Sequence, residues 1–409
     1  MNVNNKRKII NDPVFGFINI PSGLIYDIIK HPYLQRLNRI RQLGLASLVY
    51  PGAQHTRFHH SVGAMHLMSE AITQLRLKGN EILPQEAESV LAAILLHDIG
   101  HGPFSHVLEH SLIHNLHHEN ISLMMMQEMN VAFNGKLELA LEIFQDNYPK
   151  HFLHQLVSGQ LDMDRLDYLR RDSFFTGVVE GNIGSARIIK MLNIQDDRLV
   201  VEAKGIYSIE NFLMARRLMY WQVYLHKTAI AAEKMLIRTL VRAKELAKQG
   251  VELFATPALR FFLYNDVTDE NFDTEALKQF ALLDDNDLWC SLKVWVSHSD
   301  FVLSTLSQCL INRNLFKIEI SSEPFDDDKI QELTSTFAHQ FNISEEEASF
   351  FVISDSISTN MYTEADDSID IIYNTGEIKD ITEASDMLNI SLMSKNIKKY
   401  YCCFLRYSK

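Results

Sequence analysis

The chain has 409 residues, so we expect one large domain with smaller additions. Hydrophobic residues make up 46% of the chain and charged residues 22%, which allows a sizeable buried core. The formal net charge of −13 argues against a general nucleic-acid coat protein, because such proteins usually need a basic surface. An acidic exterior still permits a phosphate substrate, provided that the pocket itself is basic.

The first two thirds of the chain are predicted to be helical. Apolar residues recur at helical spacing over residues 22–48, and a helix is expected from Thr56 to Leu77. Residues 85–97 (QEAESVLAAILLH) are strongly apolar and too long for a typical strand, so they predict a buried helix that ends before Gly100. Further helices are expected over residues 105–116, 119–129, 151–173 and 208–248.

The sequence changes in character after residue 310. Four short segments there are rich in β-branched and aromatic residues and predict strands: 315–320, 350–353, 368–373 and 399–405. Helical patterns lie between them at 328–341 and 382–388. The predicted fold class is therefore mainly α, with a helical domain over residues 1–310, a motif-bearing core at residues 45–175, and a smaller C-terminal α+β module over residues 311–409.

The cysteines and the N-terminus favour a reducing compartment. Cys290, Cys309, Cys402 and Cys403 include no spaced pair suited to zinc, so free thiols are expected. The first ten residues lack the apolar region of a signal peptide, and no long uncharged apolar run predicts a membrane span. We therefore expect a cytoplasmic protein.

Histidines are concentrated in one part of the sequence. Eleven of the 17 histidines lie between His55 and His118, and histidine is the commonest metal ligand in proteins. In the run LHDIGHGPFSH (96–106), His97 and Asp98 are adjacent at the end of the predicted buried helix. A buried carboxylate needs a partner, which a divalent cation would supply.

Two further metal ligands are predicted, His60 on the preceding helix and Asp164 in LDMDRLDYLRRD (161–172). Two imidazoles and two carboxylates suit Mn, Fe, Mg, Ni, Co or Zn, so the ligands do not name the ion. The plainer alternative makes His60 a surface histidine and His97–Asp98 a helix cap. A lone His-Asp pair is a weak signal, but here R-F-x-H-S precedes the pair and D-x-D-R-x-D-Y follows it.

These motifs closely resemble those of the HD-domain phosphohydrolase superfamily, and more narrowly the dNTP triphosphohydrolases related to the SAM-and-HD-domain proteins. The resemblance covers residues 8–240, with motif order and spacing kept, and only loosely extends to NRNLFKIE (312–319). Its matching segments are NDPVFGFI (11–18), QRLNRIRQLG (35–44), PGAQHTRFHHSVG (51–63), LLHDIGHGPFSHVLE (95–109), HHEN (117–120), LDMDRLDYLRRD (161–172) and YLHK (224–227).

The resemblance implies an all-helical core around a divalent metal and the hydrolysis of a dNTP to a deoxynucleoside and triphosphate. It places His60, His97, Asp98 and Asp164 on the metal-ligand positions, with Asp164 also aligning the nucleophile. It places His101, His106 and His118 on the histidines that face the phosphates, with His106 as the proton donor and Glu109 as the carboxylate that orients it. The implied substrate-binding residues are Gln42, Leu43, Arg57, Arg165, Tyr168, Asp172, Arg216 and Tyr224.

Some features depart from the family pattern. Lys30 and Asn38 stand where better-studied relatives have the Asp and Arg of a guanine-reading activator site, so such a site is not expected. Two alternatives remain open: an HD enzyme that acts on another nucleotide or phosphomonoester, and a non-catalytic nucleotide-binding regulator. Family analogy suggests a homo-oligomer, a dimer or a tetramer. The net charge argues against nucleic acid as a partner. The basic strip Arg238, Arg242, Lys244 and Lys248 could contact polynucleotide or a neighbouring subunit, but its spacing favours a solvated helix face.

Overall fold

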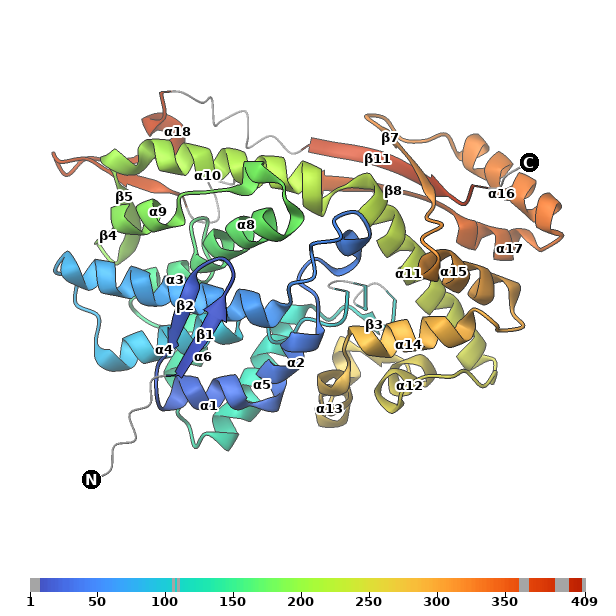
Figure 1. The fold of residues 1–409 in the computed structure, drawn as a ribbon, viewed down its shortest axis with the longest axis horizontal. Helices are drawn as coiled ribbons and strands as arrows, with labels where there is room; N and C mark the ends of the chain where they lie inside the picture. Colours follow the sequence, from blue (N-terminus) through green and yellow to red (C-terminus); the bar gives the residue numbers. More distant parts are fainter. Residues whose placement is uncertain (1–7, 105–106, 109–110, 360–367, 387–396, 407–409) are drawn as a thin grey trace.

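The structure is a computed structural model, and it describes the chain except residues 1–7, 105–106, 109–110, 360–367, 387–396 and 407–409. Helices dominate it, so the prediction of a mainly α fold is confirmed (Figure 1). The helices are α1 (Leu24–Lys30), α2 (Pro32–Arg36), α3 (Arg57–Leu77), α4 (Pro84–Leu96), α5 (His118–Ala132), α6 (Glu138–Phe144), α7 (His151–Val157), α8 (Met163–Thr176), α9 (Ser185–Met191), α10 (Ile206–Met219), α11 (Lys227–Lys248), α12 (Pro257–Tyr264), α13 (Thr274–Leu282), α14 (Asp285–Trp295), α15 (Phe301–Ile311), α16 (Asp327–Phe341), α17 (Glu345–Ala348) and α18 (Ile381–Ala384).

The strands form small separate sheets. An N-terminal hairpin pairs β1 (Lys8–Asp12) with β2 (Gly16–Ile20), and a short parallel pair joins β3 (Ile113–His114) to β6 (Val267–Thr268). One sheet has the order β10 (Ile378–Asp380), β9 (Asp370–Ile372), β5 (Arg198–Glu202) and β4 (Leu192–Gln195). The other has the antiparallel order β7 (Lys317–Ser321), β11 (Ile397–Phe404) and β8 (Val352–Thr359).

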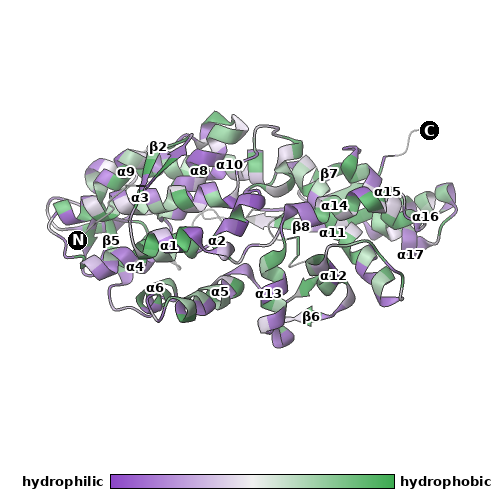
Figure 2. Cartoon of the chain, turned by 60° about the horizontal axis from the view of Figure 1, so that its bottom comes forward, coloured by the Kyte–Doolittle hydropathy of each residue, from purple (hydrophilic) through white to green (hydrophobic). Residues whose placement is uncertain are grey.

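The helical core of the first half of the chain is built around α3, which packs against α4 and α8. The buried face of α3 carries Val62, Met65 and Leu75, and residues 90–96 of α4 are all apolar and buried. Figure 2 shows the contrast with the outer helices, most of which carry both hydrophilic and hydrophobic residues. Within the described part of the chain, every helix is too short or too polar to cross a lipid bilayer.

Three long predicted helices are interrupted. The segment 22–48 breaks where Pro32 follows His31, because the residue before a proline avoids the helical conformation. The segment 151–173 divides into α7 and α8, and 208–248 divides into α10 and α11, with a π-helical turn at Tyr220–Tyr224 between the latter two. A helix expected over 105–116 does not form in the described residues there, which make turns and then β3.

The predicted domain boundary at residue 310 stays a prediction. The strands after residue 310 belong to two different sheets. Strands β7, β8 and β11 form the sheet at one end of the molecule, whereas β9 adds in parallel to β5 of the helical part. Figure 1 shows these late segments at both ends of the structure. The chain therefore returns to the helical part before it makes its last strand.

A buried carboxylate fixes the start of α4. Glu86 accepts hydrogen bonds from the backbone N–H of Leu83 (2.7 Å), the hydroxyl of Tyr148 (2.7 Å) and the ammonium of Lys150 (2.9 Å). Burial raises the pKa of Glu86, but these three donors outweigh burial and leave the pKa below its ordinary value. The ionised form is therefore the one that the fold stabilises.

Glu86→Gln should lower the free energy of unfolding by about 1–3 kcal/mol at neutral pH, because the charged hydrogen bonds are lost. A depressed pKa in the folded state makes this contribution fully present above the ordinary glutamate pKa of 4.5 and progressively lost below it. Urea unfolding of both proteins between pH 7 and pH 3.5 measures the difference. The exposed Glu88→Gln on the same helix is the control, and an equal effect of the two changes at pH 7 would contradict the assignment.

Candidate metal centre and substrate cavity

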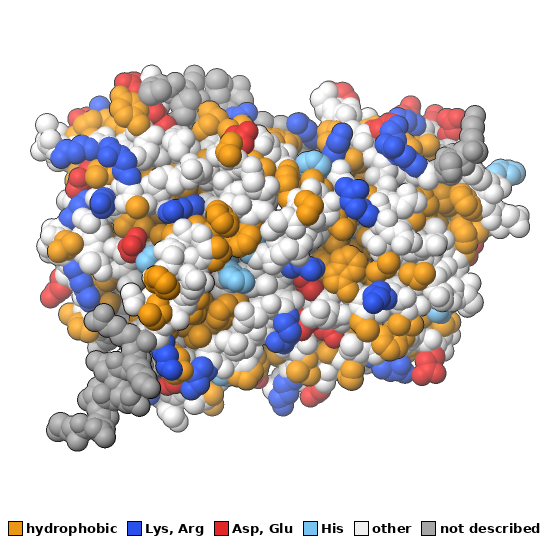
Figure 3. Space-filling model, viewed as in Figure 1, with side chains coloured by type: hydrophobic (Ala, Val, Ile, Leu, Met, Phe, Trp, Pro, Cys, Tyr) orange, Lys and Arg blue, Asp and Glu red, His pale blue; other side chains and the backbone are white. Residues whose placement is uncertain are grey.

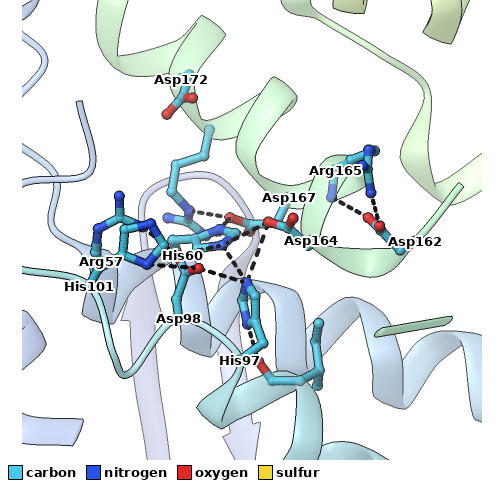
Figure 4. Close-up of polar contacts among 12 residues, drawn as sticks. Arg57, His60, His97, Asp98, His101, Asp162, Asp164, Arg165, Asp167 and Asp172 are labelled. Carbon is cyan, nitrogen blue, oxygen red and sulfur yellow. Dashed lines mark hydrogen bonds and ion pairs between the residues drawn. The ribbon is translucent and has the colours of Figure 1, made fainter. Parts of the chain in front are cut away.

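Three separate segments bring the predicted metal ligands together (Figure 4). His60 lies on the first turn of α3, His97 follows the last residue of α4, and Asp164 is on the first turn of α8. His60 Nε2 is 3.3 Å from His97 Nε2 and 3.0 Å from Asp164 Oδ1, and His97 Nε2 is 3.5 Å from the same oxygen. Among the described residues, these three form a group that could hold a metal ion.

The fourth predicted ligand, Asp98, adjoins this group. Its Oδ2 is 3.7 Å from His60 Nε2 and its Oδ1 is 3.5 Å from His97 Nε2. Asp98 also accepts a hydrogen bond from Arg57 Nη1 at 2.5 Å and lies 3.3 Å from His101 Nδ1. The Asp98 carboxylate is thus beside the other three ligands but is drawn toward Arg57 and His101.

The hydrogen bonds of the two imidazoles fit metal binding. Nδ1 of His60 lies 2.8 Å from Asp167 Oδ2, and Nδ1 of His97 lies 2.6 Å from the Ile94 carbonyl oxygen. A carbonyl or carboxylate oxygen can only accept, so each Nδ1 carries a hydrogen, and the lone pair of a neutral ring is then on Nε2. Both Nε2 atoms face each other and the Asp164 carboxylate, so the donor set fits a divalent cation.

The electrostatics of the site also favour a cation. Burial would lower the pKa of His60, but hydrogen bonds and charges from Asp164 and Asp167 raise it to about 10. Burial would raise the pKa of Asp164, yet the imidazoles of His60 and His97 hold it far below its usual range. Carboxylates thus dominate this buried site, and positive charge is needed to balance them.

A second layer of ion pairs holds the His60 ring. Arg171 Nε and Nη2 donate to Asp167 Oδ2 and Oδ1, both at 2.9 Å, and Arg171 Nη1 donates to Asp12 Oδ2 at 2.7 Å. Gly63 on α3 makes room for this pair, because a Cβ there would lie 2.1 Å from both Arg171 Nη2 and Asp167 Oδ1. We did not predict these roles, although Asp167 lies in the quoted D-x-D-R-x-D-Y motif, three residues after Asp164 and four before Arg171.

A cavity of about 460 Å³ adjoins the metal group, which is a size typical of small-molecule sites. Most of the predicted catalytic and substrate residues that the structure describes line it: Gln42, Leu43, Arg57, Asp98, His101, His118, Asp164, Arg165, Tyr168, Asp172 and Tyr224. The lining also includes residues that we did not predict, among them Phe104, Tyr220 and Glu233. Phe104 lies within the quoted run 96–106, whereas Tyr220 and Glu233 lie outside the quoted motifs.

Two predicted arginines differ in their placement. Arg165 lines the cavity, but its guanidinium also pairs with Asp162. Arg216 does not line the cavity; its Nη1 donates to Gln160 Oε1 at 2.9 Å. The α10 register points Arg216 into protein, where it is buried, so its predicted contact with substrate stays a prediction.

The predicted sugar-side residues are linked to one another. Asp172 Oδ2 accepts from the Tyr224 hydroxyl at 2.7 Å, and Asp172 Oδ1 lies 2.7 Å from His55 Nε2. The ring of Tyr168 meets that of Tyr224 edge-on, with centroids 5.8 Å apart. Burial raises the pKa of both tyrosines, so their hydroxyls remain neutral donors.

Three histidines are predicted to face the phosphates, and the structure describes two of them. His101 and His118 have ring centroids 3.8 Å apart, and both line the cavity beside Asp98. Gly100 allows this approach, because a Cβ there would lie 2.2 Å from the His118 carbonyl oxygen. The predicted proton donor His106 and its carboxylate Glu109 lie outside the described residues.

This chain is similar in sequence and fold to several known proteins. The HD domain family matches residues 57–169, and the HD associated region matches residues 183–256. A crystal structure of a phosphohydrolase from Bacteroides thetaiotaomicron is 69% identical and has a TM-score of 0.96, over 98% of this chain and 100% of that chain. The protein YwfO of Bacillus subtilis is 30% identical over 93% of this chain and 88% of its own length. The chain is an HD-domain phosphohydrolase.

The name of another relative of this HD-domain phosphohydrolase specifies a substrate. The deoxynucleoside triphosphate triphosphohydrolase SAMHD1 homolog of Dictyostelium discoideum is 31% identical over 60% of this chain and 51% of its own length. This chain therefore spans about half of that relative. HD domains bind divalent metals, and the group formed by His60, His97 and Asp164 agrees with that, so the prediction of a divalent metal cofactor is confirmed.

Proposed function

We propose that this phosphohydrolase cleaves deoxynucleoside triphosphates to a deoxynucleoside and inorganic triphosphate. The observation that carries the proposal is the cavity of about 460 Å³, which joins the metal group to polar side chains suited to a sugar and to phosphates. The similarity to a triphosphohydrolase over 60% of the chain supports the same substrate class. When bound, the divalent cation supplies a Lewis acid for the phosphoryl group.

Gln42 is the best-placed residue to bind the sugar. It lines the cavity, and its Oε1 is buried with no hydrogen-bond partner among the described residues. A buried acceptor without a donor is costly, so a ligand hydroxyl that donates to it is favoured. Gln42 would thus bind the 3'-hydroxyl, and the neighbouring Leu43 would pack against the deoxyribose ring.

Tyr168 would close the sugar site on the other side. Its ring lines the cavity between the metal group and Tyr224, with centroids 6.5 Å from His60 and 5.8 Å from Tyr224. A ring packed against C2' leaves no room for a 2'-hydroxyl, which gives a preference for deoxynucleotides. Arg57 and Arg165 supply cationic forks for the phosphates, and His101 and His118 add donors beside them.

The protein loaded with Mn²⁺ should release triphosphate and deoxynucleoside from dNTPs, and should act on the matching NTPs about 10- to 200-fold more slowly. The measurement is anion-exchange chromatography of the products from four dNTPs and four NTPs, repeated with Mg²⁺, Fe²⁺, Co²⁺ and Ni²⁺. Gln42→Ala should raise KM for the dNTPs. Release of single phosphates would instead indicate another phosphoester substrate, and binding without turnover with every metal would indicate a regulator.

Nucleic acid as a substrate or partner finds little support. Of the basic strip on α11, Arg242 pairs with Asp300 at 2.6 Å, and Lys244 is buried with its ammonium on the Leu112 carbonyl oxygen at 2.9 Å. The expectation of a solvated face is therefore wrong for these two residues, because segments both earlier and later in the chain pack over this part of α11. Figure 3 shows lysines and arginines scattered over one face of the molecule. The homo-oligomer and the cytoplasmic location stay predictions.

A further inference from the structure

Asp285, the first residue of α14, joins two segments of chain that line the substrate cavity. The residue is 3% exposed, and its side chain carries two acceptor oxygens. Oδ2 accepts from the backbone N–H of Arg41 at 3.0 Å, and Oδ1 accepts from the backbone N–H of Phe104 at 3.2 Å. One carboxylate thus binds two backbone groups that lie 63 residues apart in sequence.

Both bound segments lead directly into the site. Arg41 precedes Gln42 and Leu43, which line the cavity. Phe104 lines the cavity as well and lies three residues after His101. The two segments also touch each other, since a Cβ on Gly44 would lie 3.4 Å from the Phe104 Cα.

The backbone of Phe104 needs an external constraint. Its φ is 56°, in the left-handed region that non-glycine residues rarely adopt. Such conformations persist where the surroundings over-determine them, and they concentrate at functional sites. The hydrogen bond to Asp285 and the edge-on contact between the Phe104 and Trp289 rings, with centroids 5.6 Å apart, both come from α14.

Arg36 at the end of α2 also binds the same loop. This arginine is 1% exposed, and its Nη1 and Nη2 donate to the carbonyl oxygens of Ile99 (3.2 Å) and His101 (2.8 Å). Asp285 accepts from an N–H of the loop, whereas Arg36 donates to its carbonyls. Side chains therefore bind both a backbone N–H and backbone carbonyl groups of the loop that carries His101.

We propose that Asp285 is a positioning residue for this phosphohydrolase, and that it sets the Gln42 segment and the His101–Phe104 segment at the spacing that substrate binding requires. It touches neither the metal group nor the cavity itself. It also lies outside both family-matched regions, 57–169 and 183–256, so α14 completes the site from elsewhere in the chain. The proposal rests on the proposed function only for the choice of substrate in its kinetic test.

Asp285→Asn is the sharpest test, because an amide has one acceptor oxygen where the carboxylate has two. One of the two backbone N–H groups then loses its acceptor and faces an NH2 group instead. Asp284→Asn is the matched control: it makes the same change one residue earlier and keeps an N-cap residue. Asp284 accepts from the Arg39 side chain and from Asn286, and it binds neither the backbone N–H of Arg41 nor that of Phe104.

Hydrogen–deuterium exchange of the Mn²⁺-loaded protein should show at least tenfold faster exchange in the peptides that contain Arg41 and Phe104 for Asp285→Asn. The Asp284→Asn protein should exchange like the parent there. For any dNTP that the parent hydrolyses, KM should rise about tenfold while bound Mn²⁺ stays equal. A purely structural role would instead lower kcat and metal content together and leave KM unchanged.

Exchange needs no substrate, so the test separates the two proposals. If no dNTP is hydrolysed, the proposed function fails, but the exchange result still decides the role of Asp285. If Asp285→Asn does not fold, Asp285→Glu keeps the charge and both acceptors on a longer arm, and should show the faster exchange with metal binding intact. Unchanged exchange in both segments, or equal changes in the Asp284→Asn control, would overturn the proposal.

Discussion

The variant that carries both His97→Ala and Asp98→Ala should bind no divalent metal and show no turnover, while its helical content stays that of the parent protein. His97 Nε2 lies 3.3 Å from His60 Nε2, and Asp98 lies within 3.7 Å of the same nitrogen, so the change removes two of the four predicted ligands. Two remaining ligands are too few for the mixed nitrogen–oxygen shell that divalent transition metals prefer. Bound Mn²⁺ by mass spectrometry, triphosphate release and circular dichroism measure the three outcomes.

A matched control exists on α3. His66 and Glu70 form a partly exposed i,i+4 pair, with 3.6 Å between His66 Nε2 and Glu70 Oε1, and neither belongs to the metal group. The double variant His66→Ala with Glu70→Ala should keep both metal and turnover. If the His97–Asp98 variant retained one metal per chain, the ligand assignment and the proposed chemistry at this site would both be wrong.

Arg171→Met should lower the free energy of unfolding by about 3–5 kcal/mol, because it leaves buried carboxylates without their cation. Arg171 is fully buried and serves both Asp12 and Asp167. The affinity for Mn²⁺ should also fall about 10- to 100-fold, since Asp167 would no longer hold the His60 ring in place. Chemical denaturation of the metal-free protein and calorimetric Mn²⁺ titration measure the two effects separately.

Arg170 provides the comparison for this prediction. It is the neighbouring residue, and its contacts are long, at 3.3 Å to Ser185 Oγ and 3.4 Å to the Val14 carbonyl oxygen. Arg170→Met should therefore cost well under half as much stability and leave Mn²⁺ affinity unchanged. Equal losses of stability and Mn²⁺ affinity in the two variants would contradict the role given to the Asp12–Arg171–Asp167 ion pairs.

Several parts of this protein follow from the sequence alone. The apolar run of 85–97 and the helical pattern from Thr56 to Leu77 gave α4 and α3 within a residue or two, because local periodicity and the Gly100 stop signal are sufficient there. His60, His97 and Asp164 were recognised from motif spacing, and the structure brings them within 3.5 Å of one another. Residue types at fixed offsets on rigid helices carry that information locally.

Tertiary structure decided what depends on contacts between distant segments. No local pattern shows that Arg171 reaches back to Asp12 or that Arg216 faces Gln160. The same holds for Asp285, whose partners Arg41 and Phe104 precede it by more than 180 residues. The sequence by itself thus determined helices such as α3 and α4 and predicted the side chains of the metal group. The packing of the helices determined how each charged group is paired, because a buried charge without a partner is costly.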